Sequence, residues 1–264
     1  MHDFNYQKAG SVADAVSALN AADDGTVMAG GMTLLPTLKQ RLAAPSDVID
    51  LAGASGLSGI SVSGGVTIGA MTTHAAVAGS ADVKGAIPAL AGLAEGIGDP
   101  QVRNRGTIGG SVANNDPAAD YPAACLALGA MIQTDRREIP ADDFFNGLFE
   151  TALAEDEIIT SVSFPTAEKA AYIKFPNPAS RYALVGVFVA KTAAGVRVAV
   201  TGAGDSGVFR ASALEQALSS NFSPSALDDI TVSADGLMSD IHASAEYRAH
   251  LITTMAKRAV TAAG

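Results

Sequence analysis

Apolar residues recur along the first fifty positions at spacings that alternate between those of short strands and those of amphipathic helices. Ser11 is a candidate N-cap, and the apolar residues that follow it fall at helical spacing. Pro36 lies near the start of a second helix, where proline is tolerated. The pattern predicts strands at 3–6, 26–29 and 47–51 and helices at 12–22 and 33–42. The glycine turn between the second strand and the second helix predicts parallel pairing of the strands on either side.

From residue 53 to residue 165 the pattern changes to short strands rich in β-branched residues and helices rich in alanine. Ser63-Gly64-Gly65 separates two strand candidates within residues 59–72 and predicts a hairpin. Thr72 or Thr73 is a candidate cap for a helix that runs to Ala78. The other predicted segments are helices at 87–94 and 123–130, a helical turn at 142–147, and strands at 131–134 and 158–164.

The last hundred residues have a strands-then-helices order, which is typical of a small α+β domain. A domain boundary is predicted between Pro165 and about Pro178. Beyond it the pattern predicts strands at 183–190 and 196–200 and helices at 212–218, 223–228 and 244–261. The chain is therefore expected to be α+β, with domains at 1–165 (subdomains about 1–52 and 53–165) and at 166–264.

Composition excludes several classes of protein. The formal net charge of −10 argues against a nucleic-acid partner, because neutralising phosphates requires clustered Lys and Arg. No apolar run approaches the ~20 residues of a membrane span, and the N-terminus lacks the basic and apolar regions of a signal peptide. A cytoplasmic protein without a membrane span is therefore expected. A single cysteine, Cys125, excludes an internal disulfide and any cysteine-based iron–sulfur site within this chain.

Two glycine-rich stretches carry the candidate chemistry. Residues 29–33 follow an apolar strand, and residues 103–122 interrupt a chain that is otherwise rich in alanine and valine. Glycine lets bare backbone approach a ligand, and exposed amides in such loops bind anions, above all phosphate. Two Gly-Gly loops about 80 residues apart predict a pyrophosphate held from both sides. The alternative for either loop alone is a tight turn.

Other polar candidates have simpler structural interpretations. His74 is expected to make structural hydrogen bonds at a helix start, and no histidine pair has zinc-protease spacing. Cys125 is expected to be an inert core residue. Asp142-Asp143 is expected to be a helix cap, and Asp120 either caps the following helix or binds a ligand.

The sequence around both glycine loops, and their order, resembles the FAD-binding medium subunit of molybdenum hydroxylases. This family includes the flavoprotein subunits of aerobic carbon monoxide dehydrogenase and the FAD domain of xanthine dehydrogenase. The matching stretches are AGGMTLLP (29–36), IGAMTTHAAVA (68–78), IGDPQVRNRGTIGGSVANNDPAADYPA (97–123) and SRYALVGVFVA (180–190). The resemblance covers nearly the whole chain, and the long central motif is its most specific part.

The resemblance implies a vanillyl-alcohol-oxidase-type (PCMH-type) FAD-binding domain of two α+β subdomains in residues 1–165. It further implies that residues 166–264 form a small α+β domain, as in the flavoprotein of carbon monoxide dehydrogenase. That domain is expected to contain a three-stranded antiparallel sheet and three helices.

The resemblance also assigns residues to the cofactor. The backbone that would hold the FAD pyrophosphate belongs to Ala29, Gly30, Gly31, Met32 and Thr33 and to Thr107, Ile108, Gly109, Gly110 and Ser111. Asn114 and Asp120 would lie near the phosphates or the ribityl chain. Ile97 and Ile159 would lie near the isoalloxazine ring, with Lys174 at its polar edge. Relatives often have histidine at position 32 and asparagine at position 111, and these departures leave the backbone intact.

The function implied by the resemblance is that of an oxidoreductase subunit. FAD on this chain would accept electrons from the [2Fe–2S] clusters of a small partner subunit and pass them to an external acceptor. A large partner subunit would bind molybdopterin, in a dimer of heterotrimers. Two alternatives are a nucleotide- or partner-binding module without redox activity and a self-contained FAD oxidase. The intact glycine loops weigh against the first, and the small C-terminal region weighs against the second.

Overall fold

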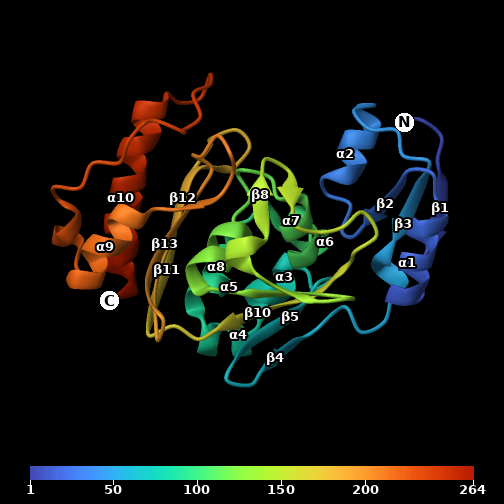
Figure 1. Ribbon diagram of the computed structural model, residues 1–264, viewed down its shortest axis with the longest axis horizontal. Coiled ribbons are helices and arrows are strands. Elements are labelled where there is room, and N and C mark those ends of the chain that lie inside the picture. Colours follow the sequence, from blue (N-terminus) through green and yellow to red (C-terminus); the bar gives the residue numbers. More distant parts are fainter.

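Three main β-sheets lie one after another in the computed structural model of residues 1–264 (Figure 1). The first sheet has the order β1-β3-β2, and both pairings are parallel, which confirms the predicted pairing. Ser11 caps α1, because its hydroxyl accepts a hydrogen bond from the amide of Asp14. The elements of this part are β1 (Asn5–Lys8), α1 (Val12–Ala21), β2 (Gly25–Met28), α2 (Leu34–Lys39), β3 (Asp47–Asp50) and the 3₁₀ helix η1 (Leu51–Gly53).

The second sheet is antiparallel and has the order β4-β5-β10-β6-β7. Its strands are β4 (Ile60–Val62), β5 (Gly65–Gly69), β6 (Met131–Thr134), β7 (Glu138–Pro140) and β10 (Ile159–Pro165). The helices between them are α3 (His74–Gly79), α4 (Ala81–Ala86), α5 (Pro88–Glu95), α6 (Pro100–Arg105), α7 (Ile108–Asn114) and α8 (Tyr121–Leu128). A 3₁₀ helix η2 (Ala141–Asp143) precedes the two-stranded ribbon of β8 (Phe145–Gly147) and β9 (Glu150–Thr151). The hairpin predicted within 59–72 is confirmed as β4–β5.

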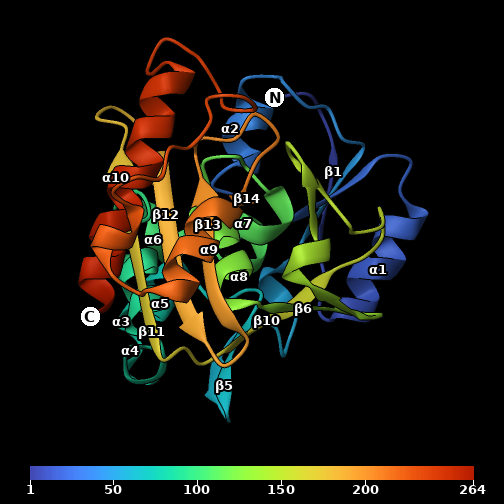
Figure 2. The same cartoon turned by 60° about the vertical axis from the view of Figure 1, so that its left-hand side comes forward.

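The third sheet is antiparallel, with the order β11-β12-β13-β14. Its elements are β11 (Lys169–Pro176), β12 (Ala183–Thr192), β13 (Gly195–Thr201), β14 (Phe209–Arg210), α9 (Ser212–Ser220), the 3₁₀ helix η3 (Pro224–Leu227) and α10 (Ala245–Ala263). Helices α9 and α10 cover one face of this sheet, and α5 and α8 contact its other face (Figure 2). The sheet therefore lies between the C-terminal helices and the central body.

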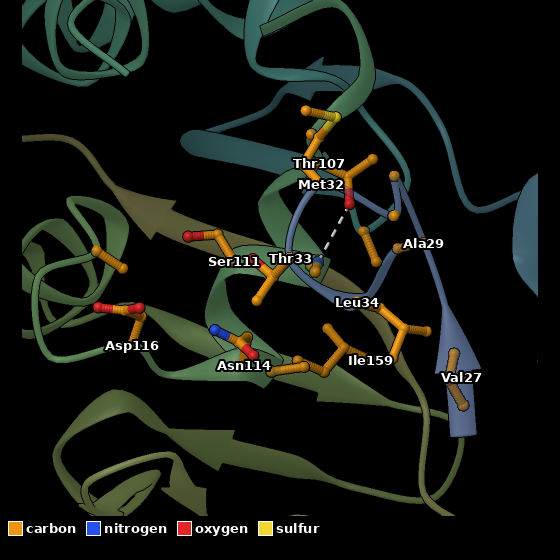
Figure 3. Close-up of a pocket in the computed structure, with 18 of the residues that line it drawn as sticks. Val27, Ala29, Met32, Thr33, Leu34, Thr107, Ser111, Asn114, Asp116 and Ile159 are labelled. Carbon is orange, nitrogen blue, oxygen red and sulfur yellow. Dashed lines mark hydrogen bonds between the residues drawn. The ribbon is translucent and has the colours of Figure 1, made fainter. Parts of the chain in front are cut away.

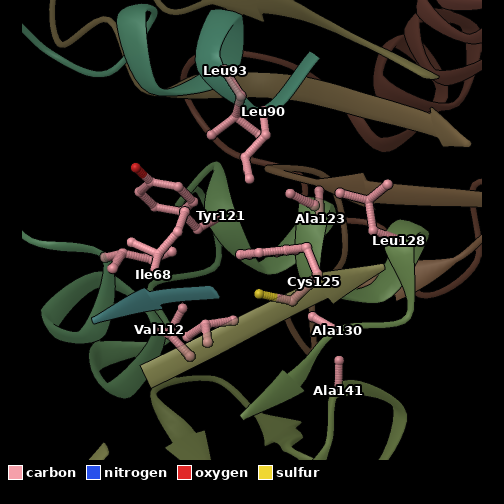
Figure 4. Close-up of a cluster of buried hydrophobic side chains, with 14 of the residues drawn as sticks. Ile68, Leu90, Leu93, Val112, Tyr121, Ala123, Cys125, Leu128, Ala130 and Ala141 are labelled. Atoms are coloured by element: carbon pink, nitrogen blue, oxygen red, sulfur yellow. The ribbon is translucent and has the colours of Figure 1, made fainter. Parts of the chain in front are cut away.

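Helix α8 is the centre of the largest core. All eight of its residues are buried, because its sequence is apolar on every side. Figure 4 shows Tyr121 and Cys125 packed among Ile68, Leu90 and Val112, which come from β5, α5 and α7. Burial raises the pKa of the Cys125 thiol, so the predicted inert core cysteine is confirmed.

Several predicted elements are wrong in detail. The stretch 103–122 is not one loop, because it contains the end of α6, all of α7 and the start of α8. Strand β11 lies at 169–176, where no strand was predicted, and the short β14 makes the C-terminal sheet four-stranded where three strands were expected. Residues 142–147 form the end of η2 and β8 instead of a helical turn, and Asp142 pairs with Arg197 at 2.9 Å instead of capping. Of the three expected C-terminal helices, the middle one is the 3₁₀ helix η3.

The structure contains no helix that is both long and apolar enough to span a membrane. It also contains no group of three or more His, Cys, Asp or Glu side chains that could hold a metal ion.

Candidate functional site

A cavity of about 480 Å³ lies between the N-terminal sheet and the central body. Its lining comes from segments within residues 26–37, 70–74, 97–120 and 153–159, together with Leu51 and Tyr182. Figure 3 shows the turn after β2 beside the start of α7. The two glycine-rich stretches, far apart in sequence, therefore contribute to one site.

The turn at 29–33 presents a row of unused backbone donors. None of the five amide N–H groups of these residues donates a hydrogen bond within the chain. Gly31 has a φ of 73°, a left-handed conformation that glycine adopts without steric cost. Unpaired amides in such a turn form a ready site for an anion.

The start of α7 is the second side of this cradle. Thr107 caps the helix, because its hydroxyl accepts a hydrogen bond of 3.1 Å from the amide of Gly110 (Figure 3). The amide of Gly109 donates to the carbonyl of Ala70 at 2.8 Å. A Cβ on Gly109 would lie 2.5 Å from the Cβ of Ala70, so only glycine allows α7 to pack this closely on the end of β5.

The two turns are also in direct contact. A Cβ on Gly30 would overlap the backbone carbonyl of Arg105, and a Cβ on Gly110 would lie 3.3 Å from that of Ala29. The glycines thus allow two backbones to meet where side chains would hold them apart. One continuous backbone surface results, with the free amides of 29–33 along one side.

Asp120 is a buried carboxylate in the cavity wall. Its carboxylate lies 3.1 Å from the ammonium of Lys174 and accepts a hydrogen bond from the hydroxyl of Tyr172. Burial raises the pKa of Asp120, and the charge of Lys174 and the Tyr172 hydroxyl oppose that rise. Asp120 is the N-cap residue of α8, but its side chain makes no capping hydrogen bond and contacts Lys174 and Tyr172 instead.

An apolar wall completes the cavity. Ile97 and Ile159 both line it. The loop that carries Ile97 is fixed by Arg103, whose guanidinium donates to the carbonyl oxygens of Ile97 and Gly98 at 2.9 and 3.1 Å. The cavity therefore combines backbone donors at one part of its wall with apolar side chains at another, which suits a ligand with a phosphate group and an aromatic ring system.

All the site residues predicted from the sequence line the cavity except Ile108 and Lys174. Ile108 is fully buried in the core beneath α7. Lys174 lies behind Asp120, where its ammonium also donates to the carbonyl of Gly96 at 2.8 Å. Figure 3 shows Asn114 and Asp116 on the same side of the site as Ser111.

His74 and Glu157 line the cavity but were not predicted as site residues. Burial lowers the pKa of His74 to about 4, and the charge of Arg103 acts in the same direction. The Nδ1 atom of His74 has no hydrogen-bond partner, whereas its backbone amide makes a structural hydrogen bond of 2.9 Å to the carbonyl of Gly106. Glu157 has a pKa of about 2, mainly because Arg137 donates hydrogen bonds to its carboxylate at 2.8 and 2.9 Å.

The model of the FAD-binding domain found in molybdopterin dehydrogenases matches residues 2–167 of the chain. The chain belongs to this family. Among its relatives, the nicotine 6-hydroxylase medium subunit of Paenarthrobacter nicotinovorans is 38% identical, with 98% of this chain and 96% of the relative covered. The carbon monoxide dehydrogenase medium chain of Hydrogenophaga pseudoflava is 34% identical, with 98% of this chain and 96% of that one covered.

Solved structures of family members share the mixed helix and sheet fold. A Cu,Mo carbon monoxide dehydrogenase chain superposes with a TM-score of 0.90 at 32% identity, over 100% of this chain and 98% of the other. A chain of quinoline 2-oxidoreductase from Pseudomonas putida 86 gives a TM-score of 0.88 at 28% identity, over 99% of this chain and 96% of the other. The family relationship therefore extends over both the FAD-binding region and the C-terminal sheet.

The residues of the cavity suit the cofactor of the family. The free amides of 29–33 suit a pyrophosphate, which needs several donors and little side-chain charge. Asp120 offers carboxylate oxygens to hydroxyl groups. Ile97 and Ile159 offer apolar surface to a flavin ring.

Proposed function

We propose that this chain is the FAD-carrying medium subunit of a multi-subunit molybdenum hydroxylase. The observation that carries the proposal is the row of unpartnered amides at 29–33, facing a cavity closed on the other side by the glycine-rich start of α7. When bound, FAD supplies an acceptor for electrons from the [2Fe–2S] clusters of a partner subunit and returns them to an external acceptor. The chain is thus an oxidoreductase subunit whose own residues bind and tune the cofactor.

The proposed residue roles follow the chemistry of the cavity wall. The backbones of 29–33 and 107–111 bind the pyrophosphate, and Asn114 and Asp120 face the phosphates or the ribityl chain. Ile97 and Ile159 exclude water from the flavin ring. Lys174 does not line the cavity, so we assign it an action on the site through Asp120.

The remaining redox centres belong to partner subunits. With Cys125 as its only cysteine, the chain cannot hold an iron–sulfur cluster itself. We therefore propose a large molybdopterin subunit and a small [2Fe–2S] subunit as partners, assembled in the cytoplasm as a dimer of heterotrimers. We also propose that residues 1–165 form a PCMH-type domain of two subdomains, about 1–52 and 53–165, and that 166–264 form the C-terminal domain.

The two alternative functions are not favoured. The match of residues 2–167 to the FAD-binding domain of molybdopterin dehydrogenases weighs against a nucleotide- or partner-binding module without flavin. A self-contained oxidase needs a substrate domain, whereas the medium subunits of nicotine 6-hydroxylase and carbon monoxide dehydrogenase align with nearly the whole chain. The substrate is oxidised on the molybdenum partner and is not specified by this chain.

The test is an absorption spectrum of the purified full chain, followed by identification of the nucleotide released on denaturation. We expect flavin bands and released FAD, either from the chain alone or after addition of FAD in the presence of its partner subunits. A chain that stays colourless and takes up no FAD under both conditions would overturn the proposal. Reduction of the bound flavin by a small organic substrate without partners would instead support the oxidase.

A further inference from the structure

We propose that Tyr172 is a positioning residue of the FAD site, which holds Asp120 in place from the C-terminal sheet, and that Gly186 is a glycine because the Tyr172 hydroxyl needs its space. This inference rests on the proposed function and extends it to two residues outside the cavity. It gives the C-terminal sheet a role in cofactor binding that acts through Asp120.

Tyr172 reaches the site from β11. Its hydroxyl donates a hydrogen bond to the carboxylate of Asp120, which lines the cavity. Its ring stacks on that of Phe188, with centroids 6.1 Å apart and an interplanar angle of 29°. Because the ring is packed, the hydroxyl has a fixed position. Lys174, two residues along the same strand, points the same way and pairs with the same carboxylate.

Gly186 is the neighbour that makes this position possible. It lies in β12 opposite Lys174, and glycine in a strand interior normally weakens the strand. A Cβ at this position would overlap the Tyr172 hydroxyl and would lie 2.9 Å from Cγ2 of Thr201. The strand therefore keeps a glycine among large apolar residues to leave room for the hydroxyl.

The same sheet also holds the segment that leads to Asp120. The hydroxyl of Thr201 in β13 donates to the carbonyl oxygens of Pro117 and Ala119 at 3.0 and 2.7 Å. The amide of Gly202 donates to the carbonyl of Pro117 at 2.8 Å. Residues 117–120 are thus bound to β11 through the carboxylate and to β13 through the backbone, so the sheet fixes where Asp120 stands in the cavity wall.

The charge of Asp120 determines which ligand groups it can bind. An ionised Asp120 only accepts hydrogen bonds, which suits the hydroxyl groups of a ribityl chain. The titratable groups near it are Tyr172 and Lys174 from β11, Tyr121 from α8 and Tyr182 in the cavity lining, and Asp116 lies near Tyr182. Among the uncharged groups, Tyr172 is the one that donates a hydrogen bond to the carboxylate.

Loss of the Tyr172 hydroxyl therefore shifts the pKa of Asp120 in a predictable direction. A hydrogen bond to a charged group is worth enough to move a pKa by about one to two units, so Tyr172→Phe raises the pKa of Asp120. Protonation of Asp120 then begins at a higher pH. The pH at which FAD affinity falls on acidification moves upward by the same amount.

The experiment measures the FAD dissociation constant of the full chain, with its partner subunits, between about pH 5 and pH 9. We expect Tyr172→Phe to bind FAD about tenfold more weakly near the wild-type midpoint, with the midpoint raised by one to two pH units. Gly186→Ala, which displaces the hydroxyl, should weaken binding in the same direction. The matched control is Tyr247→Phe, because the exposed Tyr247 on α10 makes no side-chain hydrogen bond.

A double-mutant cycle separates positioning from folding. In an Asp120→Asn background, adding Tyr172→Phe should change FAD affinity less than twofold and should leave no pH dependence from this site. Independent, additive losses would overturn the inference, as would a pH-independent loss accompanied by a fall in melting temperature. If the wild-type complex binds no FAD at all, the proposed function fails. If it binds FAD and Tyr172→Phe has the wild-type pH profile, only the inference fails.

Discussion

Gly110→Val tests whether the start of α7 holds the ligand or only the fold. A Cβ on Gly110 would lie 3.0 Å from the Thr107 hydroxyl and 3.3 Å from the Cβ of Ala29, so it meets side chains and not backbone. We expect the free energy of unfolding to fall by only about 1 kcal/mol, which is at the lower end of the cost of overpacking. The two γ-methyl groups of valine extend beyond this contact and push the turn at 29–33 away from α7.

The expected loss of binding follows from the amides on that turn. Hydrogen bonds to charged groups contribute about 1.5–3 kcal/mol each, so displacing two phosphate contacts costs at least about 3 kcal/mol. Since 1.4 kcal/mol corresponds to a factor of ten, FAD affinity should fall by roughly 100-fold or more. Isothermal titration of FAD into the full chain with its partner subunits measures this loss, and thermal melting of the same samples measures the fold.

The matched control is Gly92→Val. Gly92 is an exposed glycine of α5, and a Cβ there would meet open space. Valine is at least as good a helix former as glycine, so this variant should keep both the melting temperature and the FAD affinity of the wild type. If the FAD affinity of Gly110→Val lies within threefold of that of Gly92→Val, the assignment of the start of α7 to the pyrophosphate is refuted.

Three further predictions concern the fold around the site. Gly109→Ala should lower the melting temperature by roughly 5–15 °C, because its Cβ would lie 2.5 Å from that of Ala70; an unchanged melting curve would contradict this packing. His74 has a folded pKa of about 4, below its ordinary value of 6.5, so it contributes stability that is complete above pH 6.5 and is lost as pH falls towards 4. His74→Leu should therefore flatten stability between pH 6.5 and pH 4 in denaturant titrations, and an unchanged slope would show that another group causes the acid sensitivity. Glu157 has a folded pKa of about 2, below 4.5, so Glu157→Gln should cost about 1–2 kcal/mol at pH 7, allowing for the exposure of Arg137. That cost should shrink as pH falls from about 4.5 to about 2, and a constant difference in unfolding free energy would refute the ion-pair explanation.

Local patterns predicted much of the fold because the signals for those elements lie close together in sequence. Ser63-Gly64-Gly65 was sufficient for the β4–β5 hairpin. Strand β11 was missed because prolines bracket it, although Ala171, Ile173 and Phe175 alternate towards the C-terminal core. Helix α7 was missed because Gly109 and Gly110 disfavour a helix; packing against Ala70 and the Thr107 cap overrides that preference.

The site was predictable where backbone chemistry decides it. The glycine pairs marked both stretches, which line one cavity, although only the turn at 29–33 has a row of free amides. Residues whose roles depend on distant partners were not predictable in this way. The lowered pKa of Glu157 depends on Arg137, twenty positions away. The proposed role of Tyr172 depends on its hydrogen bond to Asp120, fifty-two positions away. No local spacing carries that information, since the fold alone brings these groups together.

The residues that line the cavity are spread along the chain, so they are synthesised at different times. The residues that line the cavity extend from Thr26 to Tyr182, and the carboxylate of Asp120 is held by Tyr172 of β11. A nascent chain emerges from the ribosome N-terminus first, so the turn at 29–33 is made long before the surfaces that it faces. A product that stops before residue 169 contains both glycine turns but lacks the strand that fixes Asp120. The wall of the proposed FAD site is therefore complete only after β11 has been synthesised.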